Sequence, residues 1–453
     1  MKRRVFICLF CVSLLGMASC TKDYSFERNG ATGSGESTVS ATVRFRSLVP
    51  ALNGTRAAGD AVRSIESLCV LLYDEEGELV TKYPLAEGGE NGYELSEEDR
   101  TSAKHPETIG GEEQELPSAE SRTPSAKFRL KIPYGRYYIY AVANMGDLSA
   151  YDEEIGTVDG LKSISLGWNG DDVSANNQMF GYFTVKGAEQ PGELATLNSP
   201  KVSLQAWMRR AVSKVTVAYD ASNLEENVFI YLKSVQIKDI PAHCHLGKKN
   251  TVSAEVGADG EKLLLPGETI VYSRAADYQE WPRLSRGKPL YGSSVQPLPE
   301  EDVKLKDYHR EDAPALYFYE NMQGVAGKDE KHKQQDADGD GVLDAPGKPG
   351  DETYVYKDDR PYGTYIEVEA YYKSNNRELP GEGTIVYRFM LGKNVTDDFD
   401  AERNHHYKLT LKFNRFANNI DWHIDYDEPK GIHAPNPYYI SYLYNNDMVL
   451  PLK

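Results

Sequence analysis

The most specific candidate for chemistry is an aspartate-rich stretch in the last third of the chain. Asp336, Asp338 and Asp340 alternate, Gly341 follows, and Asp344 occupies the ninth position counted from the first aspartate. This is the spacing of a calcium loop, in which a glycine permits the sharp turn that lets the carboxylates converge. The twelfth position is a glycine instead of a bidentate glutamate, and no helical pattern flanks the loop. We therefore expect weak calcium binding at the four aspartates, with a solvated acidic turn as the alternative.

Histidines supply two further candidates. In a strand, His243 and His245 would share one face while Cys244 points away, and no other metal-ligand cluster is near in the sequence, so we expect no metal there. His405 and His406 lie in a turn, where a structural role is expected. The chain contains no nucleophile elbow, phosphate loop, metalloprotease helix or dinucleotide fingerprint. We therefore expect no enzyme, although the paired carboxylates of a glycosidase need not be close in sequence.

The amino terminus has the pattern of an export signal. A basic start at Lys2–Arg4 precedes an apolar run too short to span a bilayer stably, and small residues lead directly to Cys20. The pattern resembles the bacterial lipobox, in which the cysteine receives a diacylglyceryl group. Because two or more acyl chains hold a protein firmly on a membrane, we predict a signal peptide at 1–19, a lipid on Cys20 and a flexible tether at 20–37. An ordinary signal peptide with a chance cysteine is the alternative.

Composition narrows the class of protein. The chain has 453 residues, a net charge of −18 and 31 tyrosines against 13 phenylalanines. Such acidity repels nucleic acid and anionic headgroups, so no nucleic-acid partner is expected. Outside the signal and the lipidation site only Cys69 and Cys244 remain, and Cys69 lies in an apolar strand pattern. A buried thiol is therefore favoured over a disulfide scaffold.

Many short segments alternate apolar and polar residues between turn signals, and no segment has a long helical period. The clearest are 38–45, 64–73, 127–133, 136–144, 201–207, 213–219, 229–237, 315–319, 364–372, 383–391 and 407–413. This pattern predicts an all-β fold of antiparallel sandwiches. We place the domains at 38–213 and 214–428, followed by a tyrosine-rich tail at 429–453. The acidic stretch 86–120 is interpreted as a long solvated loop.

Four local patterns occur in the order found in the fimbrillin superfamily of Bacteroidetes, which supplies the major, anchor and tip subunits of type V pili. The segment 137–146 resembles that superfamily's strand ending in a Val-Ala-Asn-x-Gly turn, and 207–217 resembles its entry into the second domain. The segment 317–321 is similar to its Phe-Tyr-x-x-Glu-Asn strand end, and 402–411 to its Arg-Asn-His-x-Tyr turn. The aspartate loop and the carboxyl end depart from the shaft-subunit pattern and are closer to minor and tip-type members.

The resemblance implies two tandem transthyretin-like β-sandwiches without a catalytic site, and assembly after an arginine-specific protease removes the first strand. The polar linker Asn53–Ala57 follows that strand, so we choose cleavage between Arg56 and Ala57, with Arg63 as the second choice. A strand from a neighbouring subunit would then fill the groove by β-strand addition. The candidate donor is the tail, where Tyr438, Ile440, Tyr442 and Tyr444 share one face. The alternative is that this tail packs on its own domain.

We therefore predict a structural or adhesive subunit of a cell-surface pilus, exposed on the outer membrane and held there by its lipid. Its expected partners are other pilus subunits and ligands on host or bacterial surfaces. A surface glycan-binding lipoprotein of a nutrient-uptake system is the alternative, since it would also be a tethered, tyrosine-rich β-sandwich that stacks sugars on exposed aromatic rings. An extracellular hydrolase is the third possibility.

Overall fold

The structure of the chain is a computed structural model. It describes residues 35–45, 65–88, 92–98, 107–109, 112–114, 123–185, 193–287, 290–291, 314–326, 333, 363–417 and 419–427. Strands dominate this part of the chain, which confirms the prediction of an all-β fold with antiparallel sheets. Among the residues described, no helix has the length and apolar character needed to cross a membrane.

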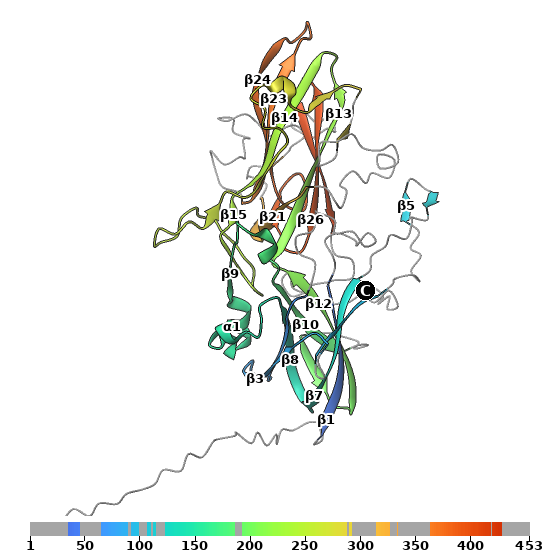
Figure 1. The fold of residues 1–453 in the computed structure, drawn as a ribbon, viewed down its shortest axis with the longest axis vertical. Coiled ribbons are helices and arrows are strands. Elements are labelled where there is room, and N and C mark those ends of the chain that lie inside the picture. Colours follow the sequence, from blue (N-terminus) through green and yellow to red (C-terminus); the bar gives the residue numbers. More distant parts are fainter. Residues whose placement is uncertain are drawn as a thin grey trace, which may run out of the picture.

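A nine-stranded sheet occupies the lower half of Figure 1. Its main path runs β3-β2-β8-β10-β12-β1-β7-β4, and β11 pairs with β8. The strands are β1 (Glu36–Phe45), β2 (Leu68–Tyr73), β3 (Leu79–Leu85), β4 (Glu94–Glu98), β7 (Thr123–Pro133), β8 (Gly135–Ala143), β10 (Met179–Val185), β11 (Leu194–Leu197) and β12 (Lys201–Arg210). A large hydrophobic core, called the first core below, lies here, and β8 is an interior strand of the sheet, as its apolar sequence predicts.

Two five-stranded sheets occupy the upper half of Figure 1 and enclose the second core. The first has the path β20-β13-β26-β27, with β21 beside β13, and the other has the path β18-β14-β23-β24, with β19 beside β14. Their bounds are β13 (Val212–Leu224), β20 (Leu290–Tyr291), β21 (Leu316–Tyr319), β26 (His406–Arg415) and β27 (Asn419–Asp427), then β14 (Val228–Lys238), β18 (Thr269–Val271), β19 (Arg283–Ser285), β23 (Tyr365–Ser374) and β24 (Gly381–Met390).

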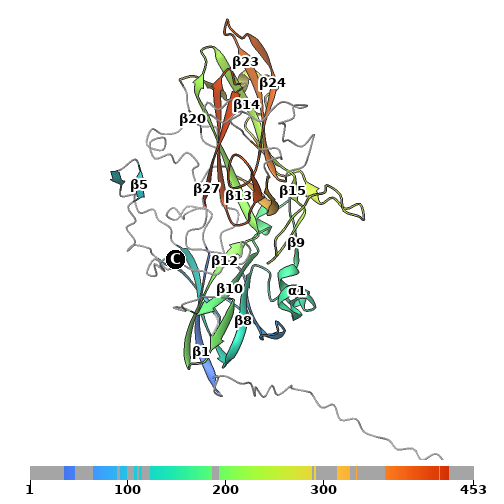
Figure 2. The same cartoon turned by 180° about the vertical axis from the view of Figure 1, so that it is seen from behind.

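Short elements complete the described fold. The two-stranded ribbons are β5 (Glu107–Ile109) with β6 (Glu112–Gln114), β9 (Ser165–Gly167) with β16 (His243–His245), β15 (Ile240–Pro241) with β17 (Leu264–Leu265), and β22 (Asn321–Val325) with β25 (Asp398–Ala401). The helices are η1 (Ser149–Tyr151), η2 (Glu154–Gly156), α1 (Val158–Ser163), η3 (Val173–Ala175) and η4 (Tyr278–Glu280). The β9–β16 ribbon joins the two halves of the molecule, as both views show (Figures 1 and 2).

The chain passes from the nine-stranded sheet to the next sheet between Arg210, where β12 ends, and Val212, where β13 begins. The domain boundaries themselves remain a prediction. Cys69 and Cys244 are both buried and unpaired, as expected of buried thiols, and burial raises the pKa of each to about 12. A tight hairpin turn joins β2 to β3, with Gly77 at a φ of 85° donating its N–H to the Asp74 carbonyl at 3.1 Å.

The interpretation of residues 86–120 as a long solvated loop is wrong for the described residues that form strands β4, β5 and β6. Strand β4 pairs with β7, so Glu94 lies opposite Lys127, and β5 and β6 form a small ribbon. This stretch has no long hydrophobic period because β4 is a five-residue strand at one end of the described path of the sheet, where it pairs with β7 alone.

Candidate functional site

Strand β1 is an interior strand of its sheet, and this position makes it the candidate functional site. It runs parallel to β12, with Thr38 opposite Lys201, and antiparallel to β7, with Thr38 also opposite Lys131. Figure 1 shows the strand at one end of the molecule. Main-chain groups on both sides of β1 are therefore used by neighbours that come from distant parts of the sequence.

The side chains of β1 alternate as a half-buried strand should. Val39, Ala41 and Val43 are buried in the first core, while Thr38 and Ser40 are exposed. Burying a valine side chain contributes about 1.5–3 kcal/mol. Removal of this strand would therefore uncover an apolar stripe as well as two unpaired strand edges.

The entry of the chain into β1 is also fixed by hydrogen bonds. Ser37 Oγ donates to the Ser199 carbonyl at 2.7 Å, and Thr38 N donates to the Pro200 carbonyl at 2.9 Å. On the other side, Tyr134 N donates to the Gly35 carbonyl at 2.9 Å. The start of β1 is thus held by the segments that begin β12 and follow β7.

The predicted site residues lie outside the described part of the chain. They are Cys20, Arg56, Ala57, the calcium-loop residues Asp336, Asp338, Asp340 and Asp344, and the donor-strand residues Tyr438, Ile440, Tyr442 and Tyr444. Their roles stay predictions. Nearest to the aspartate loop is Lys333, which is described and buried.

Lys333 inserts its ammonium group between two aromatic rings. Its Nζ lies 5.0 Å from the ring centroids of both Phe389 and Phe399 and donates to the Asn394 carbonyl at 3.0 Å. Lys333 N also donates to the Thr396 carbonyl at 2.6 Å. Burial lowers the pKa of Lys333 to about 7, partly offset by nearby aspartates, of which Asp398 has the largest effect. The chain is therefore pinned to the β24–β25 connection three residues before the aspartate loop.

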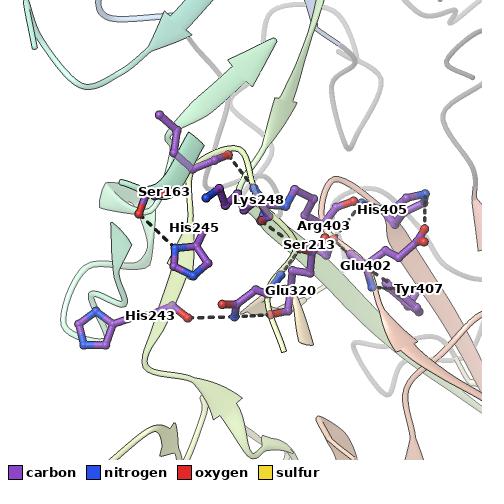
Figure 3. A network of polar contacts seen from close by, with 12 residues as sticks. Ser163, Ser213, His243, His245, Lys248, Glu320, Glu402, Arg403, His405 and Tyr407 are labelled. Carbon is purple, nitrogen blue, oxygen red and sulfur yellow. Dashed lines mark hydrogen bonds and ion pairs between the residues drawn. The ribbon is translucent and has the colours of Figure 1, made fainter. Parts of the chain in front are cut away.

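A second polar centre joins the Arg-Asn-His turn to the segment after β21 (Figure 3). The buried Arg403 donates from Nη1 to the Leu246 carbonyl at 2.8 Å, and from Nη2 to the Lys248 carbonyl and to Glu320 Oε1, each at 3.0 Å. Glu320 Oε1 also accepts from Asn250 N at 3.0 Å. Arg403 thereby uses its planar fork to bind a carboxylate and two carbonyls in the buried interior.

The rest of this turn packs against the crossing from β12 to β13. Asn404, with a φ of 61°, accepts from Arg210 N at 3.2 Å through its Oδ1. Ser213 Oγ donates to the Glu402 carbonyl at 2.6 Å and accepts from His405 N at 2.9 Å. These contacts link the turn to the passage between the two halves of the chain.

His405 and His406 are both buried in this arrangement. His405 Nδ1 lies 2.6 Å from the Arg403 carbonyl, and burial lowers the pKa of His405 to about 3 despite the neighbouring Glu402. His406 Nε2 lies 2.8 Å from Thr216 Oγ1. At neutral pH His405 is therefore an uncharged donor to a carbonyl, which is a structural arrangement.

The motif His243–Cys244–His245 forms β16, and its burial alternates as predicted: the cysteine is buried and the two histidines are not. His243 Nε2 lies 3.0 Å from Glu261 Oε1, and His245 Nδ1 lies 3.1 Å from the Ser163 carbonyl. In Figure 3 the His243 ring lies apart from the Arg403 centre. No group of three or more metal-ligating side chains occurs among the residues that the structure describes.

Sequence reasoning missed the contact between Glu320 and Arg403. Each residue lies in a segment that the resemblance had singled out, Glu320 in 317–321 and Arg403 in 402–411. The available signal was Glu320, a charged residue that directly follows the apolar strand Leu316–Tyr319, because a buried charge needs a partner.

The chain is similar to one family model and to several solved structures. The family model "Domain of unknown function (DUF4906)" matches residues 316–411, which run from β21 to β26 and include Glu320 and Arg403. No curated protein matches the chain.

Among solved structures, a "putative cell adhesion protein" from Parabacteroides distasonis is similar at 12% identity and a TM-score of 0.42, covering 88% of this chain and 99% of that one. The tip fimbrial protein Mfa3 from Porphyromonas gingivalis, with a C-terminal truncation, is similar at 10% identity and a TM-score of 0.39, covering 86% and 100%. The fimbrial anchor protein Mfa2 from Porphyromonas gingivalis is similar at 11% identity and a TM-score of 0.27, covering 90% and 100%.

Proposed function

We propose that this chain is a structural or adhesive subunit of a cell-surface pilus that assembles by strand exchange. The observation that carries the proposal is the position of β1 between β12 and β7. An amino-terminal strand that is interior to its sheet can be removed only if another strand takes its place, since two edges and an apolar stripe would otherwise be exposed.

Proteolysis is the proposed trigger. A cut between Arg56 and Ala57 would separate β1, which ends at Phe45, from β2, which begins at Leu68. The same cut would detach the body from a lipid on Cys20. Lipidation would thus hold the precursor on the outer membrane until cleavage, and an anchor subunit would have to escape cleavage.

The proposed occupant of the emptied groove is the tyrosine-rich tail of a neighbouring subunit. Tyr438, Ile440, Tyr442 and Tyr444 alternate, and β1 buries alternating side chains at Val39, Ala41 and Val43. A donor of this pattern would restore main-chain pairing on both sides and would fill the pockets left by β1. Other pilus subunits are accordingly the proposed partners.

The alternative of a glycan-binding lipoprotein receives less support from the described aromatic side chains. Trp168 packs edge-on against Tyr319 at 5.0 Å between ring centroids. Trp281 donates its Nε1–H to the Ala275 carbonyl at 2.8 Å, and Lys233 Nζ lies 5.7 Å from its ring centroid. Both indole rings are only partly exposed and are engaged in intramolecular contacts, which favours packing over stacking on sugars.

The test is assembly by the full chain in cells that contain the arginine-specific protease. Wild-type protein should give a ladder of polymers whose subunits begin at Ala57, measured by gel electrophoresis and amino-terminal sequencing. Arg56→Lys keeps the charge but removes the arginine, so it should stay lipidated and form no ladder of polymers, whereas Arg63→Ala should assemble normally. Polymers of Arg56→Lys that retain β1 would contradict strand exchange.

A second variant tests the donor. Deletion of 438–453 should leave cleavage at Arg56 unchanged while stopping polymer growth, because the groove is opened but no strand is offered. Normal polymers from this deletion would exclude the tail as donor. Exchange of Tyr442 for Phe in the full tail is the matched control and should preserve assembly.

A further inference from the structure

Strand β24 forms one edge of its sheet. Within the described part of the chain, its only neighbour is β23, with which it makes ten consecutive residue pairs without a register shift, from Tyr365 opposite Met390 to Ser374 opposite Gly381. Figures 1 and 2 show β24 at the end of the molecule opposite to β1. This edge is therefore long, regular and remote from the proposed groove.

Proteins usually protect such edges with short strands, prolines, bulges or like charges, because an exposed regular edge pairs with other chains. The edges of the nine-stranded sheet follow this rule. Strand β3 contains Pro84 and is paired with β2 through a register shift, and β4 has only five residues, three of them glutamates. Strand β24 has ten residues without proline, and on its outward face Val386 is 44% exposed. Its edge carries none of these protections.

The sequence of β24 is complementary to itself. If two copies pair antiparallel about a two-fold axis at Ile385, Glu382 of each copy lies opposite Arg388 of the other, and Thr384 lies opposite Val386. Gly383 then falls opposite Tyr387, and no atom lies within 4 Å of the position that a Cβ would take at this glycine. The opposite charges, the space at Gly383 and the exposed Val386 thus all favour the register centred on Ile385.

Within one copy, both charged groups are already oriented on this face by β23. Arg388 Nε donates to Glu367 Oε2 at 2.8 Å, and Glu382 Oε2 lies 3.4 Å from Lys373 Nζ. A guanidinium has five N–H donors and a carboxylate has two acceptor oxygens, so one group can contact more than one partner of opposite charge. In contrast, antiparallel pairing of two copies through β27, about a two-fold axis at His423, would place Asp421 of one copy opposite Asp425 of the other. Like charges would then face each other and disfavour that pairing.

We propose that β24 is a lateral interaction surface whose partner is a second copy of this chain. The two β24 edges pair antiparallel and make one sheet continuous across both copies. Because β1 lies at the opposite end of the molecule, this association leaves the groove between β12 and β7 free for axial assembly. Lateral pairing is therefore independent of strand exchange.

Sedimentation equilibrium of the purified full chain in detergent tests the proposal. Two charge variants are measured singly and as an equimolar mixture. Wild type should dimerise. Glu382→Arg and Arg388→Glu each place two like-charge pairs in the dimer and should raise its Kd about tenfold or more. An equimolar mixture of the two variants should form a one-to-one dimer, because one copy then supplies only arginine and the other only glutamate at these positions.

Controls separate the interface from misfolding. Glu153→Arg changes an exposed acid beside η2, in the half of the molecule opposite to β24, and should dimerise like wild type. Each β24 variant loses a contact with Glu367 or Lys373 and should have a lower Tm, but it should keep the circular dichroism spectrum of the folded wild type. A monomeric wild type at the highest soluble concentration would overturn the proposal. So would a mixture that fails to pair although each variant is folded, or dimers that persist in both single variants and disappear when 438–453 is deleted.

Discussion

Arg403 and Glu320, 83 residues apart in the chain, meet as an ion pair at 3.0 Å with side chains that are 6% and 1% exposed. The arginine comes from the turn before β26, and the glutamate directly follows β21. Two short motifs that looked like separate turn signals are thus the two halves of one buried contact. The contact fixes the segment 246–250 as well, because Arg403 binds two of its carbonyls and Glu320 accepts from Asn250.

Removal of one partner should destabilise the second half of the chain strongly. Arg403→Met leaves the Glu320 carboxylate buried without its countercharge, and we expect a loss of about 3–5 kcal/mol in the free energy of unfolding. The double variant Arg403→Met with Glu320→Leu should lose less than the sum of the two single losses. Urea denaturation followed by circular dichroism measures this, and strictly additive losses would contradict the coupling.

Acid should destabilise the fold through His405. Burial lowers its folded pKa from 6.5 to about 3, so protons bind the unfolded chain more readily, and stability is lost as the pH falls below 6.5. Between pH 7 and pH 4.5 this amounts to about 2.5 kcal/mol. His405→Asn keeps an N–H donor near the Arg403 carbonyl but does not titrate. Its stability should fall less over this range, and equal pH slopes for the two proteins would refute the prediction.

Lys333 should affect the stability of the fold above pH 7, whereas His405 affects it below pH 6.5. Its folded pKa is lowered to about 7, so the buried amine opposes folding fully below pH 7, and this cost declines as the pH rises toward 10.5. Relative to Lys333→Met, wild type should gain about 2 kcal/mol between pH 7 and pH 9. Thermal unfolding of both proteins at the two pH values measures the difference. No relative gain would mean that the ammonium stays charged in the folded protein.

Calcium should bind the aspartate loop weakly, with a Kd of about 10⁻⁴–10⁻³ M, because the bidentate glutamate is missing. Asp338→Asn combined with Asp340→Asn should abolish the heat of calcium binding in calorimetry of the full chain. The matched control, Asp259→Asn with Asp277→Asn, removes the same charge elsewhere and should bind as wild type. Unchanged binding by the first pair would leave only a solvated turn.

Removal of calcium by a chelator should loosen the aspartate loop but should not release Lys333, which is buried. Cleavage by trypsin should increase after Lys328 and Lys331, just before the loop, but not after Lys333, whose side chain is held between Phe389 and Phe399. Limited proteolysis with and without chelator, followed by mass spectrometry, checks this. Rapid cleavage after Lys333 would show that this anchor opens.

The strands could be predicted because their pattern is local. The alternation of buried and exposed residues along 38–45 and the apolar run of β8 are visible in single segments, and each became a strand of the expected kind. The turn at Gly77 was equally local, since only the turn geometry demands a positive φ there.

Pairing between distant segments could not be predicted in the same way. The sequence of β1 does not show that its neighbours are β12 and β7, nor that β26 runs parallel to β13. Strand β4 escaped notice because its partner β7, not its own composition, makes it a strand. The burial of Lys333 could not be predicted for a similar reason, since the two rings that its ammonium group contacts belong to Phe389 and Phe399, far along the chain.

The position of β1 also has a mechanical consequence. The chain enters the sheet at Gly35, and β1 pairs along its length through eight residue pairs with β12 and nine with β7. A pull from a membrane-bound amino end would act along the strand, so that these pairs resist together in shear instead of opening one after another. An intact precursor would therefore withstand dragging forces at the cell surface, and after a cut in the linker that follows β1 these pairs alone would hold the body to the membrane-bound end.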